Sequence, residues 1–495
     1  MNLNNSVFLV FFAMVIASCQ SDPEVNFESQ VTEEYRPAYH FTPESGWMND
    51  PNGLTYLNGE YHLFYQHYPD STVWGPMHWG HAVSTDLVNW EDLPIALYPD
   101  SLGYIFSGSA VYDAENSSGL GTAENPPMVA IFTYHNAEEA NTSSYTFQNQ
   151  AIAFSLDKGR TWDKYDKNPV LQNPGIRDFR DPKVSQITNP DGTKSWIMTL
   201  AVLDHINFYS SPDLINWSLI GEFGNTIGAH GGVWECPDLL PFKTPSGENK
   251  WVLLVSINPG GPQNGSATQY FIGDFEDGQF TPDDTMIRWI DYGPDNYAGV
   301  TYSNLPTEQN RTLFIGWMSN WIYANQVPTK VWRSAMTVPR ELSLFDIDGT
   351  LLLKSAPAKE LTDLREKEYG VKDRNSGLPS EAFEITAETK SDFFKISFSN
   401  ETGDSLFVSK ENGLVSIDRR GAGESNFNKD FSAIHSAPMS WEAKDIRIFM
   451  DAASIELFVN DGELVMTSIV FPSSPWKNVA VSENLNSLKI YNLKK

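Results

Sequence analysis

The chain has 495 residues, of which 41% are hydrophobic and 13% aromatic, so it can bury the cores of two or three domains. Asp and Glu outnumber Lys and Arg by 63 to 34, and the formal charge of −29 argues against a nucleic-acid partner, because such a surface repels phosphates. The two cysteines, Cys19 and Cys236, exclude a framework of several disulfides.

Residues 7–16 form an apolar run that is too short to span a bilayer and has the length of a signal-peptide core. Ile16-Ala17-Ser18-Cys19 follows and resembles a bacterial lipobox, in which the cysteine becomes the lipidated first residue. We therefore expect a signal peptide over 1–18, a lipid on Cys19 and an acidic tether over 19–38. These features predict an exported protein held in the bacterial outer membrane, on its surface or periplasmic face, by that lipid alone. The alternative is an ordinary cleaved secretory signal with an incidental cysteine.

A short motif recurs after strand-like runs: Ser, then Asp, then a turn, then Trp. Its three copies span 84–90, 155–162 and 210–217. The Asp can accept hydrogen bonds from amides of its own turn, and the Trp can cover the hairpin, so the motif is interpreted as structural. Repeats of about 60 residues built from short strands indicate the blades of a propeller. The stretch 39–350 has room for five such blades.

The pattern changes after about residue 350. The charged stretch 351–375 is expected to be a linker with a short helix. From 376 to 495 apolar residues alternate again, as in 393–398, and Asn460-Asp461-Gly462 provides a hairpin turn. The predicted fold is all-β, with a five-bladed β-propeller followed by a C-terminal β-sandwich.

Three acidic motifs stand out in the first domain, and each places a carboxylate beside a proline. They are Trp47-Met48-Asn49-Asp50-Pro51-Asn52-Gly53, Arg180-Asp181-Pro182 and Glu235-Cys236-Pro237-Asp238. Asp50, Asp181 and Glu235 are separated by roughly two blades and one blade, and blade-spaced positions converge at the axis of a propeller. We therefore expect one pocket. Two carboxylates are the minimum for cleaving a glycosidic bond, and a third can bind the sugar.

The neighbours of each carboxylate indicate its role. Turn-forming residues around Asp50 should donate hydrogen bonds that keep it ionised, and Arg180 should do the same for Asp181. Glu235 lies between a tryptophan and a cysteine, an apolar setting that favours the protonated form and suits a proton donor. Taken singly, the three also fit structural roles: an Asx turn, a surface ion pair and a glutamate satisfied by backbone amides.

In this order, the motifs resemble glycoside hydrolase family 32, the β-fructofuranosidases that include invertases, inulinases and levanases. The resemblance runs from about Tyr39 to the C-terminus and includes Phe106-Ser107-Gly108-Ser109. The architecture of that family agrees with the fold predicted from the repeats. The resemblance implies that Asp50 is the nucleophile, Glu235 the general acid/base and Asp181 the transition-state stabiliser of a retaining mechanism. It also implies that the Asp50 and Glu235 carboxyls lie about 5–5.5 Å apart.

Matching family positions imply further contacts to a terminal fructosyl unit. They are Asn49, Gln66, Trp74, Phe106, Ser107, Arg180 and, as an additional wall, Trp317. No cofactor is expected. No metal is expected either, because the histidines of 78–81 fall on opposite strand faces without acidic partners.

The resemblance implies an exo-acting fructan β-fructosidase (a levanase or inulinase) that releases fructose from fructans and possibly from sucrose. The intact loop 74–79 resembles that of exo-acting members and favours a closed pocket. An endo-acting levanase at the cell surface is the nearest alternative, and a sucrose-preferring invertase is another. A five-bladed family that acts on arabinans lacks the Asn-Asp-Pro-Asn-Gly context. The presence of all three carboxylates argues against a non-catalytic glycan-binding lipoprotein. The expected partner is a fructan or fructosyl oligosaccharide, and no oligomeric state is predicted.

Overall fold

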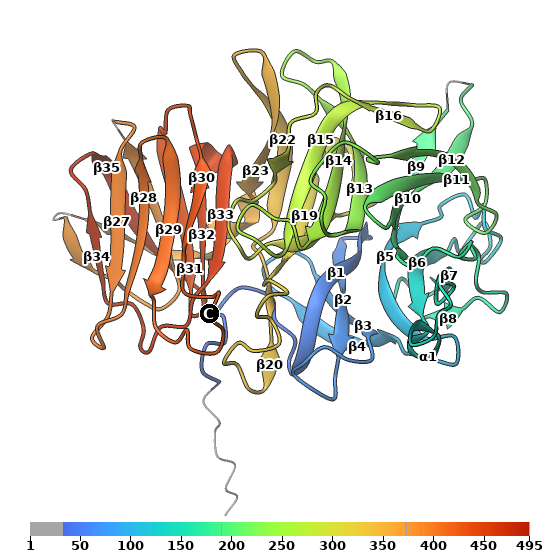
Figure 1. The fold of residues 1–495 in the computed structure, drawn as a ribbon, viewed down its shortest axis with the longest axis horizontal. Helices are drawn as coiled ribbons and strands as arrows, with labels where there is room; N and C mark the ends of the chain where they lie inside the picture. The colour runs from blue at the N-terminus through green and yellow to red at the C-terminus, as the bar shows by residue number, and fades with distance from the viewer. Residues whose placement is uncertain (1–32, 190, 372–373, 390, 495) are drawn as a thin grey trace, which may run out of the picture. The chain divides into compact units, whose positions relative to one another are not determined.

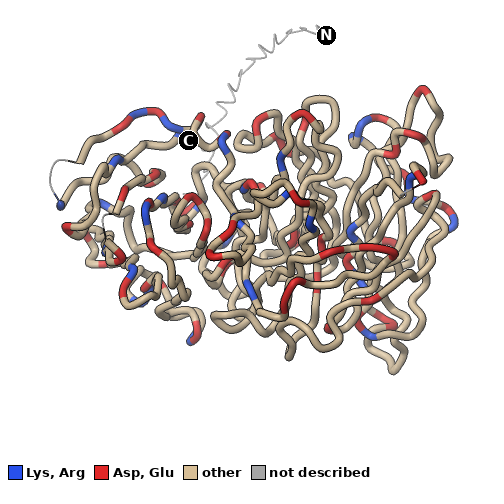
Figure 2. Tube along the Cα trace, turned by 90° about the horizontal axis from the view of Figure 1, so that it is seen from above, with Lys and Arg blue, Asp and Glu red and all other residues tan. Residues whose placement is uncertain are grey.

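The structure is a computed structural model that describes residues 33–189, 191–371, 374–389 and 391–494. The segment Glu34–Lys495 forms one compact unit whose regular secondary structure consists almost entirely of strands. The predicted signal peptide, Cys19 and most of the predicted tether lie outside the described residues. Within the described ranges, no helix has the length and apolarity needed to cross a membrane. Acidic residues are spread over both domains and outnumber the basic ones (Figure 2).

Five sheets follow one another along the chain and form the blades (Figure 1). Blade 1 contains β1 (Gly46–Leu57), β2 (Glu60–Tyr68), β3 (His78–Ser84), β4 (Glu91–Leu97) and the short β20 (Trp332–Arg333). Blade 2 contains β5 (Tyr104–Tyr112), β6 (Met128–His135), β7 (Gln148–Ser155) and β8 (Asp163–Lys164). Blade 3 contains β9 (Phe179–Thr188), β10 (Lys194–Val202), β11 (His205–Ser211) and β12 (Ser218–Phe223).

Blades 4 and 5 have the same arrangement of four strands as the earlier blades, and each contains one additional short strand. Blade 4 contains β13 (Val233–Lys243), β14 (Asn249–Asn258), β15 (Ala267–Glu276), β16 (Gln279–Pro282) and β17 (Arg288–Trp289). Blade 5 contains β18 (Tyr297–Thr301), β19 (Thr312–Met318), β21 (Ala335–Met336), β22 (Arg340–Ile347) and β23 (Thr350–Pro357). The first strands β1, β5, β9, β13 and β18 each contact the next, and β18 contacts β1, so the ring closes. The predicted five-bladed propeller is confirmed.

The recurring Ser-Asp-Trp motif forms the turn between the third and fourth strands of blades 1 to 3. In each copy the aspartate accepts hydrogen bonds from amides of its own turn. The indole nitrogen of the tryptophan donates to the carbonyl three residues earlier, as from Trp90 to Leu87 at 3.1 Å and from Trp217 to Leu214 at 3.0 Å. The motif is structural, as predicted.

Two six-stranded sheets form the C-terminal β-sandwich. The first has the order β24 (Arg365–Gly370), β35 (Leu485–Leu493), β26 (Phe383–Thr389), β31 (Asp445–Asp451), β32 (Ser454–Val459), β33 (Leu464–Ile469). The second has the order β25 (Asn375–Gly377), β34 (Asn478–Val481), β27 (Phe394–Ser399), β28 (Ser405–Glu411), β29 (Leu414–Gly421), β30 (Ile434–Pro438). Alternate residues face the core, as in β27, where Phe394, Ile396 and Phe398 are fully buried. Within the part of the chain that the structure describes, the helical segments are α1 (Ala137–Ala140), η1 (Thr307–Gln309), η2 (Lys359–Leu364) and η3 (Asn460–Gly462).

Two segments that the sequence assigned to connections belong to the folded body. The predicted linker 351–375 contains most of β23, which completes blade 5, then η2, and then β24, an edge strand of the sandwich. Its charged residues are divided among these elements, and those of β24 are mostly exposed, as an edge strand allows. The end of the predicted tether also packs on the body, where the amide of Ala38 donates to Asp451 Oδ1 at 2.7 Å.

Buried ion pairs join the propeller to the sandwich. Arg340 of blade 5 donates to Glu456 Oε2 at 2.6 Å and to Asp291 Oδ2 at 2.9 Å. In the opposite direction, Arg419 of the sandwich donates to Asp295 Oδ2 of the propeller at 2.7 Å. Both arginines are almost fully buried, so each pair is shielded from solvent.

His40, just before the first blade, belongs to the same junction. Its ring lies 2.8 Å from Asp451 Oδ2 through Nδ1 and 2.9 Å from Glu456 Oε1 through Nε2. Burial would lower the pKa of His40, but the hydrogen bonds to Asp451 and Glu456 outweigh it and raise the pKa to about 9. The histidine is therefore a cation at neutral pH.

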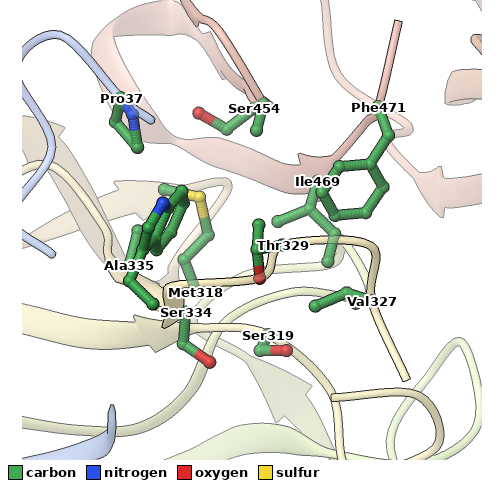
Figure 3. Close-up of a pocket in the computed structure, with 12 residues that line it drawn as sticks. Pro37, Met318, Ser319, Val327, Thr329, Ser334, Ala335, Ser454, Ile469 and Phe471 are labelled. Atoms are coloured by element: carbon green, nitrogen blue, oxygen red, sulfur yellow. The ribbon is translucent and has the colours of Figure 1, made fainter. Parts of the chain in front are cut away.

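A small cavity lies at this junction, between Pro37, Met318 and Phe471 (Figure 3). Its volume of about 30 Å³ has room for water only. Its walls are mostly apolar, and it contains no carboxylate. It is therefore excluded as a site for a sugar.

Candidate active site

The first strand of every blade departs from regular pairing near the same end of the propeller. The pairing register shifts at Met48/Pro51 in β1, at Ile105/Gly108 in β5, at Glu235/Asp238 in β13 and at Tyr297/Val300 in β18. For β9 the shift is seen in its partner strand β10, at Thr199/Ala201. A β-bulge re-aims the side chains it carries. Asp181, Cys236 and Ala298 have positive φ angles of 65°, 45° and 53° there. Such backbone is strained in residues other than glycine and concentrates at functional sites.

The bulged segments line one cavity of about 380 Å³, a volume within the range of ligand sites. The structure brings nearly all of the predicted site residues together in it: Asn49, Asp50, Gln66, Trp74, Phe106, Ser107, Arg180, Asp181 and Glu235. The sequence interpretation missed several others that line it: His135, Ala140, Phe147, Gln148, Arg177, Asp178 and Trp321. Most of these additions come from blade 2 and the connection that follows it.

Trp317 is not a wall of this cavity. It lies on the second strand of blade 5, away from the axis, and is fully buried. Its ring packs against Trp321 with the centroids 5.0 Å apart, and Trp321, in the following loop, lines the cavity instead. Trp47 stacks on Trp321 from β1 at 5.7 Å. The predicted wall residue is therefore corrected from Trp317 to Trp321, which lies four residues later in the loop after β19.

Asp50 is held by hydrogen bonds from neutral groups. Its Oδ2 accepts from the Ser107 hydroxyl at 2.6 Å, and its Oδ1 accepts from the Asn49 amide at 2.9 Å. The indole of Trp47 donates to the oxygen of the Asn49 amide at 2.7 Å and fixes its orientation. Burial and the nearby Glu235 raise the pKa of Asp50, while the bonds from Ser107 and Asn49 oppose the rise.

Glu235 has a polar setting, which differs from the apolar one predicted. Its Oε1 accepts from Arg180 through Nε at 3.1 Å and through Nη2 at 2.9 Å. Its Oε2 accepts from the hydroxyl of Tyr297, which begins β18. Arg180 also donates to Asp178 Oδ1 at 2.6 Å. The two-point bond to Arg180 and the bond to Tyr297 leave the carboxyl of Glu235 in one orientation.

Asp181 is almost fully buried, and Arg180 does not pair closely with it. The guanidinium Nε lies 4.0 Å from Asp181 Oδ2, while the amide of Cys236 donates to that oxygen at 3.2 Å. Burial raises the pKa of Asp181, Glu235 and Asp50 add to the rise, and Arg180 opposes it. Arg180 favours the ionised form of Asp181, as predicted, but burial outweighs it, and the hydrogen bonds of the guanidinium go to Glu235 and Asp178. Carboxylates crowded in a buried site repel one another, and this repulsion contributes to the raised pKa of Asp50 and of Asp181.

Comparison with known proteins gives the family. The Glycosyl hydrolases family 32 N-terminal domain matches residues 40–355, and the Glycosyl hydrolases family 32 C-terminal domain matches residues 354–494. The chain belongs to glycosyl hydrolase family 32. The boundary between the two matched domains falls at the end of β23, where the structure completes blade 5.

Relatives of this family 32 chain cover most of its length. A levanase from Bacillus subtilis is 42% identical over 98% of this chain and 74% of the relative. An extracellular exo-inulinase from Aspergillus awamori is 36% identical over 91% of this chain and 92% of the relative. The crystal structure of the Aspergillus awamori exo-inulinase superposes with a TM-score of 0.83 at 34% identity, over 93% and 99% of the two chains. A β-fructofuranosidase from Schwanniomyces occidentalis, complexed with fructosyl-erythritol, gives 0.81 at 32% identity over 94% and 98%.

Cys236 follows Glu235 directly, and its Sγ lies 3.5 Å from Asp50 Oδ2 and 3.7 Å from Asp181 Oδ2. One residue of this hydrolase site, Tyr297, escaped the sequence interpretation although the sequence carried a signal for it. Tyr297 comes 62 residues after Glu235, one blade further on. Extending the blade spacing to the fifth blade would have found it. Among the described residues, no cluster of His, Cys, Asp and Glu has the arrangement of a metal site.

Proposed function

We propose that this family 32 hydrolase is an exo-acting fructan β-fructosidase, which releases terminal fructose from levan or inulin and also acts on sucrose. The observation that carries the proposal is one cavity at the propeller axis that unites Asp50, Asp181 and Glu235 with donors for sugar hydroxyls. The relatives named levanase and exo-inulinase support the same substrate class.

The exo mode is supported by the wall on the blade 1 side. The amide of Trp74 donates to Asn325 Oδ1 at 2.9 Å, which ties the loop after β2 to the long loop of blade 5. The ring of Trp74 meets Phe106 of blade 2 edge-on, with centroids 6.1 Å apart. A wall that spans three blades suits a pocket for a chain end, whereas an endo-acting enzyme needs a groove open at both sides.

In the proposed mechanism Asp50 attacks the anomeric carbon while Glu235 gives its proton to the leaving oxygen. A covalent fructosyl–Asp50 ester forms and the remainder of the substrate departs. Glu235, now ionised, takes a proton from water, which attacks the same carbon and releases fructose with retained configuration. Asp181 binds ring hydroxyls and stabilises the positive charge that develops in both transition states.

The contacts of the three carboxylates suit these roles. The bonds from Ser107 and Asn49 hold the Asp50 oxygens in place for attack. Arg180 and Tyr297 hold the Glu235 carboxyl in place for both steps. Burial and repulsion among the carboxylates raise the pKa of Asp50 and of Asp181.

Product analysis tests the proposal. Levan, inulin and sucrose are incubated separately with the wild-type chain and with Asp50→Asn, and the products are separated by length over time. We expect fructose as the first product from each fructan and no product from the variant. Asp86→Asn, in a structural turn of blade 1, is the matched control and should retain activity. Oligosaccharides that precede fructose would establish an endo-acting levanase, and an inactive wild type would favour a glycan-binding protein.

We further propose that the chain is exported and anchored in the outer membrane by a lipid on Cys19. The apolar run 7–16 followed by Ile16-Ala17-Ser18-Cys19 supports this, and related exo-inulinases are named extracellular. Fractionation of cells that express the wild type and Cys19→Ser tests it. The wild type should sediment with outer membranes and the variant should not. A wild type that is wholly soluble would contradict the anchor.

A further inference from the structure

A buried ion pair lies on the propeller axis beyond the carboxylates. Lys183 Nζ is 3.2 Å from Asp238 Oδ2 and donates to the carbonyl of Thr301 at 2.5 Å. Asp238 Oδ2 also accepts from the Thr301 amide at 2.8 Å and from its hydroxyl at 2.7 Å. Lys183 is 7% exposed and Asp238 only 1%, so the pair is shielded from water.

This pair connects the same three strands that carry one side of the active site. Lys183 follows Asp181 on β9, and Asp238 follows Glu235 on β13. The bulge between Glu235 and Asp238 lets both side chains face the axis. The third strand, β18, contributes the partner residue Thr301 at one end and Tyr297, which bonds Glu235, at the other. The ion pair therefore forms a second layer under the layer of carboxylates.

The other neighbouring inner strands are joined at this depth by neutral groups. The amide of Gly108 on β5 donates to Asn52 Oδ1 on β1 at 2.9 Å. The hydroxyl of Ser109 on β5 donates to the Pro182 carbonyl on β9 at 3.0 Å. A buried ion pair contributes little net stability compared with an apolar pair, because both charges lose hydration, and its best-attested use is to fix register. A charged link between β9, β13 and β18 is therefore better explained by alignment than by stability.

We propose that Lys183 and Asp238 are positioning residues that set the height of β9 relative to β13, and thereby the placement of Asp181 relative to Glu235. The proposal rests on the roles given to those two carboxylates under the proposed function. Neither residue lines the cavity. Removing the pair lets the two strands shift along the axis, and a displacement of about 1 Å at reacting groups can lower the rate on the order of 10²-fold.

The test compares two double variants in which a buried ion pair becomes neutral. Lys183→Met with Asp238→Asn removes the axial pair, and Arg340→Met with Glu456→Gln removes the junction pair as a matched control. On sucrose or levan we expect kcat of the axial variant to fall roughly 10-fold to 100-fold, with KM changed less than about threefold, since the fructosyl contacts of blades 1 and 2 remain. The control variant should lower Tm but keep the kcat of the wild type.

A milder variant covers the case in which the axial variant does not fold. Thr301→Val removes the hydroxyl hydrogen bond to Asp238 and keeps the backbone one. It should lower kcat about threefold to tenfold. Its Tm should fall less than that of the junction control. Wild-type kcat in folded Thr301→Val, or in a folded axial double variant, overturns the proposal. A loss confined to KM overturns it as well. An inactive wild type would instead refute the proposed function on which it rests.

Discussion

Two buried clusters of charge in this protein are balanced in different ways. At the junction between propeller and sandwich, Arg340 bonds both Asp291 and Glu456, and His40 bridges Glu456 and Asp451. At the propeller axis, Arg180 bonds Glu235 and Asp178. Asp50 and Asp181 receive hydrogen bonds there mainly from neutral groups.

The difference indicates what each cluster is for. Paired charges at the junction fix how two cores meet, so removing one partner should mainly affect folding. The crowded carboxylates at the axis repel one another, and Asp181 and Cys236 hold strained backbone there. Such a site lowers the stability of the fold in exchange for catalytic activity. Removing a carboxylate should therefore lower the reaction rate and leave the stability of the fold unchanged or increased.

The sharpest test of this contrast is the same substitution in both clusters. Glu235→Gln should lower kcat roughly 10²-fold to 10⁴-fold, because the acid/base is lost, and should leave Tm unchanged or raised. Glu456→Gln, the matched control, should lower Tm and leave kcat unchanged. Initial rates on sucrose and thermal unfolding of both variants provide the measurement. A marked fall in Tm for Glu235→Gln would remove the contrast between the two regions.

The next effect concerns the junction alone. Arg340→Met leaves Asp291 and Glu456 buried without their cation, and should destabilise the fold by about 3–5 kcal/mol. Urea unfolding measures the loss, and adding Glu456→Gln to the variant should recover part of it. The activity of the folded fraction should equal that of the wild type. No change in the unfolding midpoint would contradict the role assigned to the pair.

The junction should also depend on pH in a predictable direction. The folded pKa of His40 is raised to about 9 from its ordinary value of 6.5, so the histidine contributes stability that is complete below pH 6.5 and is lost as pH rises toward 9. The loss should be on the order of 3 kcal/mol. Urea unfolding at several pH values, with the wild type and His40→Gln, measures it. The variant should lack this part of the slope, and equal slopes would refute the assignment.

The smallest effect is expected at the axis. Tyr297→Phe removes the hydroxyl that donates to Glu235 and should lower kcat about tenfold, the equivalent of roughly 1.5 kcal/mol. Stability should change little, because the ring stays buried against Trp317. Steady-state kinetics with sucrose measures the change. Wild-type kcat in this variant would show that Arg180 alone orients Glu235.

Much of the architecture was accessible from the sequence. The turn motifs ending at Trp90, Trp162 and Trp217 mark blades because an aspartate that bonds its own turn is a local feature. The spacing of Asp50, Asp181 and Glu235 predicts a shared pocket, since a propeller brings blade-spaced positions to one axis. The alternation of apolar and polar residues over 376–495 predicts the sandwich, because successive side chains of a strand point to opposite faces of the sheet.

The sequence by itself therefore determined local patterns and spacings. These were enough to predict the blades, the sandwich and the meeting of the three acidic motifs in one pocket. The tertiary structure decided which side chains touch. Bulges re-aim the side chains they carry, so Arg180 donates hydrogen bonds to Glu235, while Asp181 lies 4.0 Å from its Nε. Packing between blades decided that Trp321 lines the cavity in place of Trp317. Such contacts join residues far apart in the chain, and they depend on how the strands are aligned around the axis, which no local pattern specifies.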